Sequence, residues 1–319
     1  MYFGGRDGRA LARIVTDVTR LLAVDGSTFV HITLGAANSV TIVSNKVLLT
    51  SPLFEVPQNF ALPLSALPYV CQSLRFYSTE EQLEFADGVA VKPAAGEATA
   101  DVMRISFVPD KAVFGDSVLH YSKLVEDVFE LCLHHPQLEV LVRDNRNKYH
   151  QQNYLHCPRG MVHLAEDQAA EFVGGAYPIA VMQDCIDGVT YKIAATWSRS
   201  WNPQPLIACF ENERMADAEC DMITTTLAGM GDVLRAYIKS FPDKNSRFTA
   251  RKLRNGLILV AARYGVPDGD WEEKVQRAHN KRVRDFVKKK FLGHVLDNSD
   301  FLNFILHRFD TTNPGAIMF

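Results

Sequence analysis

The sequence lacks long hydrophobic runs. None of its apolar stretches approaches the roughly 18 consecutive residues of a membrane-spanning helix. The N-terminal segment, MYFGGRDGRALARI, has no apolar core of the kind that a secretory signal requires. The sequence therefore predicts a cytoplasmic protein with no membrane contact.

Cysteine is scarce, and the six cysteines form no CxxC pair. They are Cys71, Cys132, Cys157, Cys185, Cys209 and Cys220. The absence of such pairs argues against a zinc ribbon or a CxxC redox motif. Most cysteines stand between apolar residues, as in Leu131-Cys132-Leu133, so we predict reduced thiols in the core.

Several signatures of catalysis are also missing. The chain has no G-x-S-x-G elbow, no H-E-x-x-H pair and no Walker motif. His150, His156, Cys157 and His163 have the spacing H-x5-H-C-x5-H, which matches no standard zinc site. We therefore expect no metal site.

Composition and length are those of an ordinary globular protein. A chain of 319 residues, 47% hydrophobic and 22% charged, is long enough for two domains with cores. Residues 230–319 contain 17 Lys and Arg against 10 Asp and Glu, although the whole chain has a net charge of −3. An acidic N-terminal part and a basic C-terminal part of the sequence indicate two units with different surfaces.

Apolar periodicity predicts an α+β order of elements. In the first part we expect helices over residues 8–24 and His120–His135, and strands over Phe29–Leu34, Ser39–Val43, Met103–Val108 and Leu138–Arg143, with a polar loop or hairpin over residues 145–175. In the second part we expect strands over Tyr191–Trp197, Leu206–Phe210 and Leu257–Val266, a long helix over residues 217–240 and a basic helix over residues 271–291. The expected domains are residues 1–176 and 177–295, followed by a C-terminal helix or tail over residues 296–319. Its phenylalanines would dock on the body or, alternatively, contact a partner.

Five short motifs fall in the order and spacing of one family. Met1–Gly4 reads M-Y-F-G, and Leu11–Leu21 occupies the register of a G-L-H-H-L-V-x-E-V-V-D-N helix. Met103–Phe114, MRISFVPDKAVF, is similar to T-x-V-x-F-x-P-D-x-x-x-F. Phe210–Asn212 matches F-x-N, and Leu253–Gly256 resembles V-R-E-G. Over roughly residues 1–295 the chain thus resembles the N-terminal half of DNA gyrase B, a type IIA topoisomerase component.

This resemblance implies a fold in two parts. The first is a Bergerat-type (GHKL) ATPase-like sandwich, with helices on one face of a mixed sheet. The second is a ribosomal-S5-like transducer domain, a βαβ unit with a long helix. The arm that precedes M-Y-x-G in the family, and the segments that cleave DNA, are not expected in this chain.

The residues that contact ATP in the family are mostly replaced here. The catalytic Glu corresponds to Asp17, a base one methylene shorter, and a misplacement of about 1 Å can cost ~10²-fold in rate. The magnesium-binding Asn corresponds to Leu21, the adenine-reading Asp to Asn45 and the adenine-site Thr to Met103. The Gly-rich lid corresponds to Pro63–Pro68, which contains no glycine.

The lysine that reaches the γ-phosphate has only a shifted counterpart, Lys274, one register away. Because magnesium and lysine normally neutralise the charge on the phosphates, the resemblance implies a pseudo-ATPase for which ATP and magnesium are not expected cofactors. An ATP-binding topoisomerase component survives only if Asp17 and Lys274 compensate.

A basic stripe is the clearest surface signal. Lys274, Arg277, Lys281, Arg284 and Lys288 recur at steps of three and four residues, on one face of the expected helix. Such a stripe can bind DNA phosphates, although an ordinary solvated helix face has the same pattern.

Two functions remain open from the sequence. The first is a gyrase-B-like paralogue that has lost ATP hydrolysis and acts as a binding or regulatory module, with DNA or another protein as partner. The second is an enzyme that uses the former nucleotide cavity for an apolar small molecule. Asp17 would then be its acid or base, in apolar surroundings that include Leu48 and Leu49, with Asn45 as a polar anchor. The sequence leaves the oligomeric state open.

Overall fold

The chain divides into two compact units, residues 1–160 and 161–319. The computed structural model describes residues 9–46, 67–78, 82–91, 102–146, 148–172, 174–199, 204–240, 250–267, 271–301 and 303–304. The division lies before the expected boundary after residue 176, because the helix α6 (Met161–Ala170) packs on strands of the second unit.

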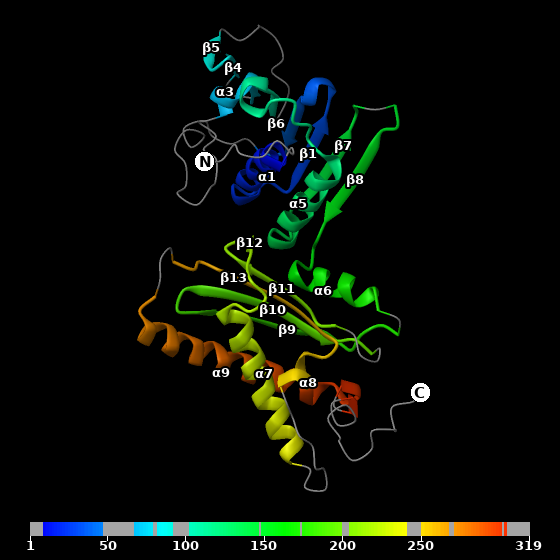
Figure 1. The fold of residues 1–319 in the computed structure, drawn as a ribbon, viewed down its shortest axis with the longest axis vertical. Coiled ribbons are helices and arrows are strands. Elements are labelled where there is room, and N and C mark those ends of the chain that lie inside the picture. Colours follow the sequence, from blue (N-terminus) through cyan, green and yellow to red (C-terminus); the bar gives the residue numbers. More distant parts are fainter. Residues whose placement is uncertain are drawn as a thin grey trace. The chain divides into compact units, whose positions relative to one another are not determined.

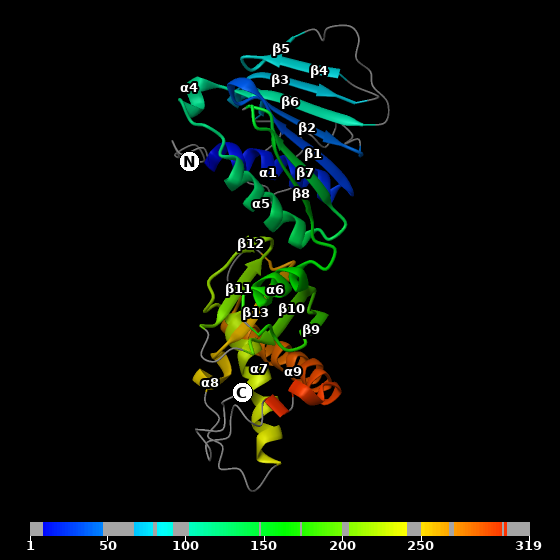
Figure 2. The same cartoon turned by 90° about the vertical axis from the view of Figure 1, so that its right-hand side faces the viewer.

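The first unit is an eight-stranded sheet with helices on one face (Figures 1 and 2). Its helical segments are α1 (Arg9–Val24), η1 (Ala36–Asn38), α3 (Leu67–Val70), α4 (Lys111–Phe114) and α5 (Tyr121–His134). Its strands are β1 (Phe29–Leu34), β2 (Val40–Ser44), β3 (Cys71–Tyr77), β4 (Gln82–Ala86), β5 (Val89–Val91), β6 (Met103–Pro109), β7 (Glu139–Asp144) and β8 (Gln151–His156). They run in the order β5-β4-β3-β6-β2-β1-β7-β8, and only β1 and β7 pair in parallel.

Alternating apolar residues explain this layer arrangement. Val30, Ile32 and Leu34 of β1 are buried while the residues between them are not, so one face of the strand meets the helices. In α1 the residues from Ile14 to Thr19 are all buried, and the helix packs against α5. The helices and strands expected in the first part are confirmed, as is a mixed sheet with helices on one face.

The second unit is a five-stranded sheet with helices on both faces. Its strands are β9 (Ala180–Ile186), β10 (Val189–Trp197), β11 (Leu206–Glu211), β12 (Arg214–Met215) and β13 (Leu257–Tyr264), in the order β12-β11-β13-β10-β9. Its helices are α6, α7 (Asp221–Lys239), α8 (Ala250–Arg254) and α9 (Glu273–Asp297). β11 and β13 are parallel, so with α7 between them they form the expected βαβ unit.

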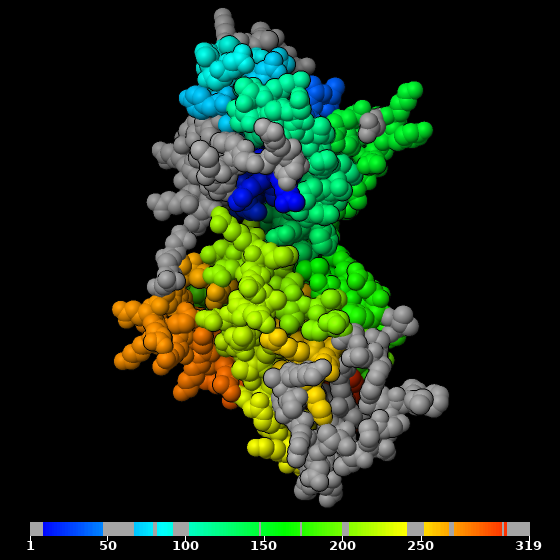
Figure 3. Space-filling model, viewed as in Figure 1, coloured from blue at the N-terminus to red at the C-terminus, as the bar shows by residue number. Residues whose placement is uncertain are grey.

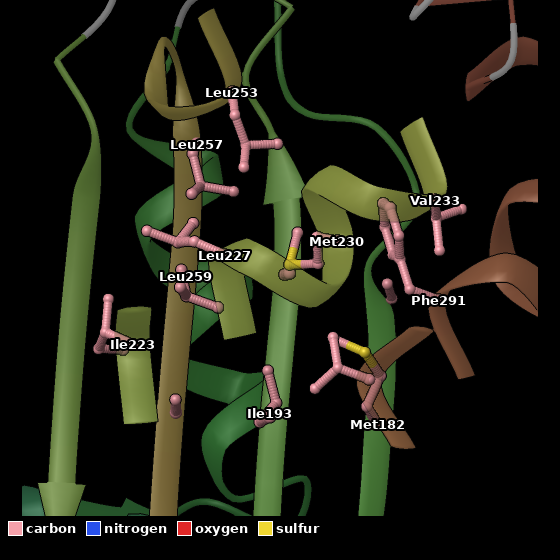
Figure 4. Packing of buried hydrophobic residues seen from close by; sticks show 14 of the residues in the cluster. Met182, Ile193, Ile223, Leu227, Met230, Val233, Leu253, Leu257, Leu259 and Phe291 are labelled. Atoms are coloured by element: carbon pink, nitrogen blue, oxygen red, sulfur yellow. The ribbon is translucent and has the colours of Figure 1, made fainter. Parts of the chain in front are cut away.

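The main core of this unit lies between the sheet and the helices α7 and α9 (Figure 4). Ile193 of β10 and Leu259 of β13 meet Met230 of α7 there. The alternate residues of β13, such as Val260, are equally buried, and α6 packs against β10 and β13. A strand buried on both faces accounts for the continuous apolar run that predicted it.

The described part of the C-terminal segment packs on this core. Phe304 stacks on Tyr177 with ring centroids 4.1 Å apart, and Phe301 lies 5.2 Å from Trp197. Docking on the body is therefore confirmed for these two side chains. Residues 305–319 lie outside the described part of the chain.

Candidate functional site

Helix α1 holds Asp17, the candidate catalytic residue, in ion pairs with its own neighbours. Asp17 is 4% exposed. Its carboxylate pairs with Arg20, one turn ahead, and its Oδ2 lies 3.9 Å from Nε of Arg13, one turn behind. Both arginines share its side of the helix, so this carboxyl has charged neighbours, whereas Leu48 and Leu49 of its expected apolar surroundings lie outside the described residues.

Asn45 follows β2 and joins it to the start of β1. Its amide oxygen accepts hydrogen bonds from the backbone N–H groups of Thr28 (3.2 Å) and Phe29 (3.0 Å). Its Nδ2 donates to Oγ1 of Thr28 over 2.8 Å. The polar atoms of Asn45 thus bind the chain itself, although the residue is exposed.

Met103 lies beside this junction, in the core. It pairs with Ser44 across β6 and β2, immediately before Asn45, and is 0% exposed. The hydroxyl groups of Ser44 and Ser27 lie 2.9 Å apart and link the turn after α1 to the same junction. Leu21, on the last turn but one of α1, is half-buried.

Other parts of the expected nucleotide pocket lie outside the described residues or in the second unit. Residues 1–8 and 47–66, which include Leu48, Leu49 and most of the lid segment, lie outside the described residues. Of that segment, Leu67 and Pro68 begin α3 and are buried. Lys274 is exposed on α9 of the second unit.

The basic stripe on α9 is partly neutralised by acids. Nε and Nη2 of Arg284 donate to the two carboxylate oxygens of Asp232 on α7, over 2.8 and 2.9 Å, and these bonds lower the pKa of Asp232. Nζ of Lys288 lies 3.9 Å from the same carboxylate, and Arg277 pairs with Glu273.

Lys274 and Lys281, also on α9, are exposed and form no ion pair with any residue that the structure describes. The N-terminal half of α9, orange in Figure 3, lies at the surface.

A buried polar chain, not predicted from the sequence, ties α9 to the β9–β10 turn. Nε2 of His279 lies 2.6 Å from Oη of Tyr191, and its Nδ1 lies 2.8 Å from Oδ2 of Asp187. Arg282 pairs with the same carboxylate. Tyr191 and His279 are each 1% exposed, so these hydrogen bonds have a structural role. The only signal in the sequence was a histidine on an otherwise apolar helix face.

A pair of cysteines, Cys209 and Cys220, was also missed, because neither belongs to a short motif. Their sulfur atoms lie 2.9 Å apart.

The second unit also contains a cavity of about 300 Å³ beside α7 and α8. Its lining is Thr224, Leu227, Ala228, Gly231, Arg235, Leu253 and Arg254. Within the described ranges there is no group of three or more His, Cys, Asp or Glu side chains that could hold a metal ion. The helices whose residues are described include none that is long and apolar enough to cross a membrane.

Comparisons with known proteins found likeness in structure but none in sequence. No protein-family model and no curated protein matches the chain. The 43K ATPase domain of Thermus thermophilus gyrase B, solved with an aminocoumarin, superposes with a TM-score of 0.76 and 16% identity over 97% of this chain and 90% of that one.

Two further solved structures are similar to a comparable extent. Gyrase B from Myxococcus xanthus has a TM-score of 0.75 and 17% identity, over 97% of this chain and 96% of that one. The topoisomerase IV ATP-binding domain of Francisella tularensis, solved with a small-molecule inhibitor, has a TM-score of 0.69 and 15% identity, over 97% of this chain and 93% of that one. The chain therefore has the fold of the gyrase B and topoisomerase IV ATPase domains.

Proposed function

We propose that this chain is a module of the gyrase B ATPase fold that does not hydrolyse ATP and acts by binding a partner. The ion pairs of Asp17 with Arg13 and Arg20 carry this proposal. A general base must reach the proton it removes within hydrogen-bond distance. Arg20 binds one carboxylate oxygen of Asp17 and Arg13 lies 3.9 Å from the other, so the carboxylate is held against its own helix.

The other replacements support the same function. Leu21 offers no oxygen to magnesium, which prefers oxygen ligands. The amide of Asn45 is engaged by Thr28 and Phe29, and Met103 is enclosed in the core. This set of side chains does not fit a magnesium nucleotide, and it stabilises the junction of α1, β1 and β2 instead.

Calorimetry and a turnover assay test this proposal. We expect no binding heat with ATP or a non-hydrolysable analogue, with or without magnesium, and no phosphate release above the background without protein. An aminocoumarin, the ligand in the Thermus structure, serves as a second probe of the pocket and is expected not to bind.

The matched variant is Asp17→Asn, which keeps the shape of the side chain but removes its charge. If wild-type protein released phosphate and Asp17→Asn did not, the carboxylate would be a working base and the proposal would be wrong. We expect both proteins to be equally inactive, and the variant to be less stable because Arg13 and Arg20 lose their shared partner.

The alternative, an enzyme for an apolar small molecule with Asp17 as acid or base, requires a carboxyl that is accessible to a ligand. Burial of Asp17 between two arginines disfavours this alternative.

For the partner, we propose weak, sequence-independent contact with duplex DNA through Lys274 and Lys281. These two lysines lie on one face of α9, are exposed, and have no acidic partner among the described residues. The other cations of the stripe are engaged with Asp232 and Glu273. Each neutralised phosphate contributes about −0.9 to the slope of log affinity against log salt, so we expect a slope of about −2.

The DNA proposal is tested with two double variants that change charge equally. Lys274→Glu/Lys281→Glu should abolish binding to a duplex in fluorescence anisotropy. Lys289→Glu/Lys290→Glu reverses two exposed charges of the same helix off the stripe and should retain most of the affinity. Equal losses in both would show that net charge, and not this stripe, determines binding. If the wild-type protein did not bind the duplex, the proposed DNA contact would be wrong, and the proposal that the chain does not hydrolyse ATP would be unaffected.

A further inference from the structure

Two cysteines that are distant from any short motif meet in the second unit. Cys209 lies on β11, Cys220 is the residue that precedes the first turn of α7, and their sulfur atoms are 2.9 Å apart. One thiol therefore donates a hydrogen bond to the other sulfur.

The backbone holds both residues in place. Cys209 pairs with Ala261 of β13 on one side, and its carbonyl accepts from the N–H of Ala216 over 2.8 Å on the other. The N–H of Cys220 donates to the carbonyl of Asp217 over 3.0 Å, and its carbonyl accepts the helical bond from Thr224 over 3.1 Å. The two sulfurs are thus held side by side, and a movement of about 1 Å would bring them to bonding distance.

The two thiols have unlike surroundings. Cys209 is 1% exposed, whereas Cys220 is partly accessible. The hydrogen bond from Cys209 lowers the pKa of Cys220, and the N–H groups of Ile223 and Met222 at the start of α7 act in the same direction, against burial. The pKa of Cys209 is raised by the same hydrogen bond and by burial. Cys220 is therefore the more accessible and more acidic thiol, and Cys209 is the buried partner behind it.

We propose that Cys209 and Cys220 are a modification site at which hydrogen peroxide, or another small peroxide, produces a reversible intramolecular disulfide. The Cys220 thiolate attacks one peroxide oxygen, the O–O bond breaks, and a sulfenic acid and a hydroxide form. The sulfur of Cys209 then attacks the Cys220 sulfur, the S–O bond breaks, and water leaves with the proton of Cys209. In total, two thiols and one hydrogen peroxide give one disulfide and two water molecules, and an organic peroxide gives one alcohol and one water.

The disulfide would join β11 to the start of α7 and close the loop between them. Because such a link restricts the unfolded chain, oxidation is expected to raise the thermal midpoint of the second unit by roughly 5 °C. A small dithiol reductant reverses the modification by thiol–disulfide exchange.

The experiment treats the reduced full chain with an equimolar amount of hydrogen peroxide near neutral pH, then alkylates the remaining thiols and maps them by mass spectrometry. We expect a peptide that links Cys209 to Cys220, lost after dithiothreitol. Cys185 is the internal control, since it is exposed and has no sulfur neighbour among the described residues. Cys220 should be consumed roughly tenfold faster than Cys185.

Two variants assign the roles. Cys209→Ser should stop at a sulfenic acid on Cys220 that dimedone traps, and Cys220→Ser should leave Cys209 unmodified. In the wild-type protein, preferential oxidation of Cys185, or linkage of Cys220 to another chain in place of Cys209, would overturn the proposal. These wild-type readouts hold even if a variant folds poorly.

Discussion

Replacing Trp197 by alanine is expected to lower the free energy of unfolding of the second unit by about 3–5 kcal/mol. Trp197 ends β10, is 2% exposed, and its ring lies 5.2 Å from Phe301 and 6.0 Å from Phe291 of α9. Its Nε1 donates to the carbonyl of Leu253 in α8 over 2.9 Å. One side chain thus connects a strand with three later segments, and its loss leaves a cavity among them.

Trp197→Phe is the matched control. It keeps an aromatic ring at this position and removes the hydrogen bond to Leu253 and part of the ring volume, so we expect a smaller loss, of about 1–2 kcal/mol. Urea unfolding followed by far-UV circular dichroism measures both variants, since each removes a fluorophore. A loss under about 1 kcal/mol for Trp197→Ala would contradict the packing described for this residue.

Replacing Gly229 by alanine is also expected to destabilise the second unit, by about 2 kcal/mol, although this exchange inside a helix normally stabilises. Gly229 lies on α7 where the helix crosses α9. An added Cβ would stand 2.9 Å from the backbone oxygen of Arg284 and 2.9 Å from Cγ1 of Val287. Because one of these atoms belongs to a helix backbone, α9 itself would have to move, and the pair of Arg284 with Asp232 would be stretched.

Gly293→Ala is the matched control, because it makes the same exchange at a position of α9 where the added side chain does not contact α7. Gly293 is exposed on α9, and an added Cβ would meet no atom within 4 Å. We expect this variant to gain about 0.5–1 kcal/mol from helix propensity. Tryptophan fluorescence in urea reports on this unit alone, since Trp197, Trp201 and Trp271 all belong to it. Equal stability of the two variants would show that the helices do not cross as closely as described.

Elements with a regularly buried face were mostly predicted from the sequence, whereas the interior strand β3, whose burial is irregular, and the edge elements were not. The residues of β4 are almost all half-buried and those of β5 are all exposed, so neither strand carries the alternation that marks β1. Strand β9 has only Ala180 and Met182 buried. In α6 the buried residues are Met161, Ala165 and Ala169, and small alanines within a polar stretch give a weak helical signal.

In the candidate site, contacts within one helix can be inferred from residue spacing, whereas contacts between elements distant in the sequence cannot. The ion pairs of Asp17 with Arg13 and Arg20 were not predicted, although their spacing along a helix contained the signal, since residues three and four apart share a face. The contacts of Asn45 with Thr28 and Phe29 depend on how β1 and β2 pair, which periodicity does not determine. The meeting of Cys209 and Cys220 likewise depends on where α7 begins relative to β11.

The position of β13 in its sheet has a consequence for how the protein is made. β10 and β11 do not pair with each other, and both pair with β13, which follows them by more than 45 residues in the chain. During synthesis, the β9–β10 and β11–β12 hairpins can form early, but the edges of β10 and β11 that β13 covers stay open until Tyr264 has left the ribosome. Open edges are templates for association between chains, so this interval is when the nascent protein most needs protection from aggregation.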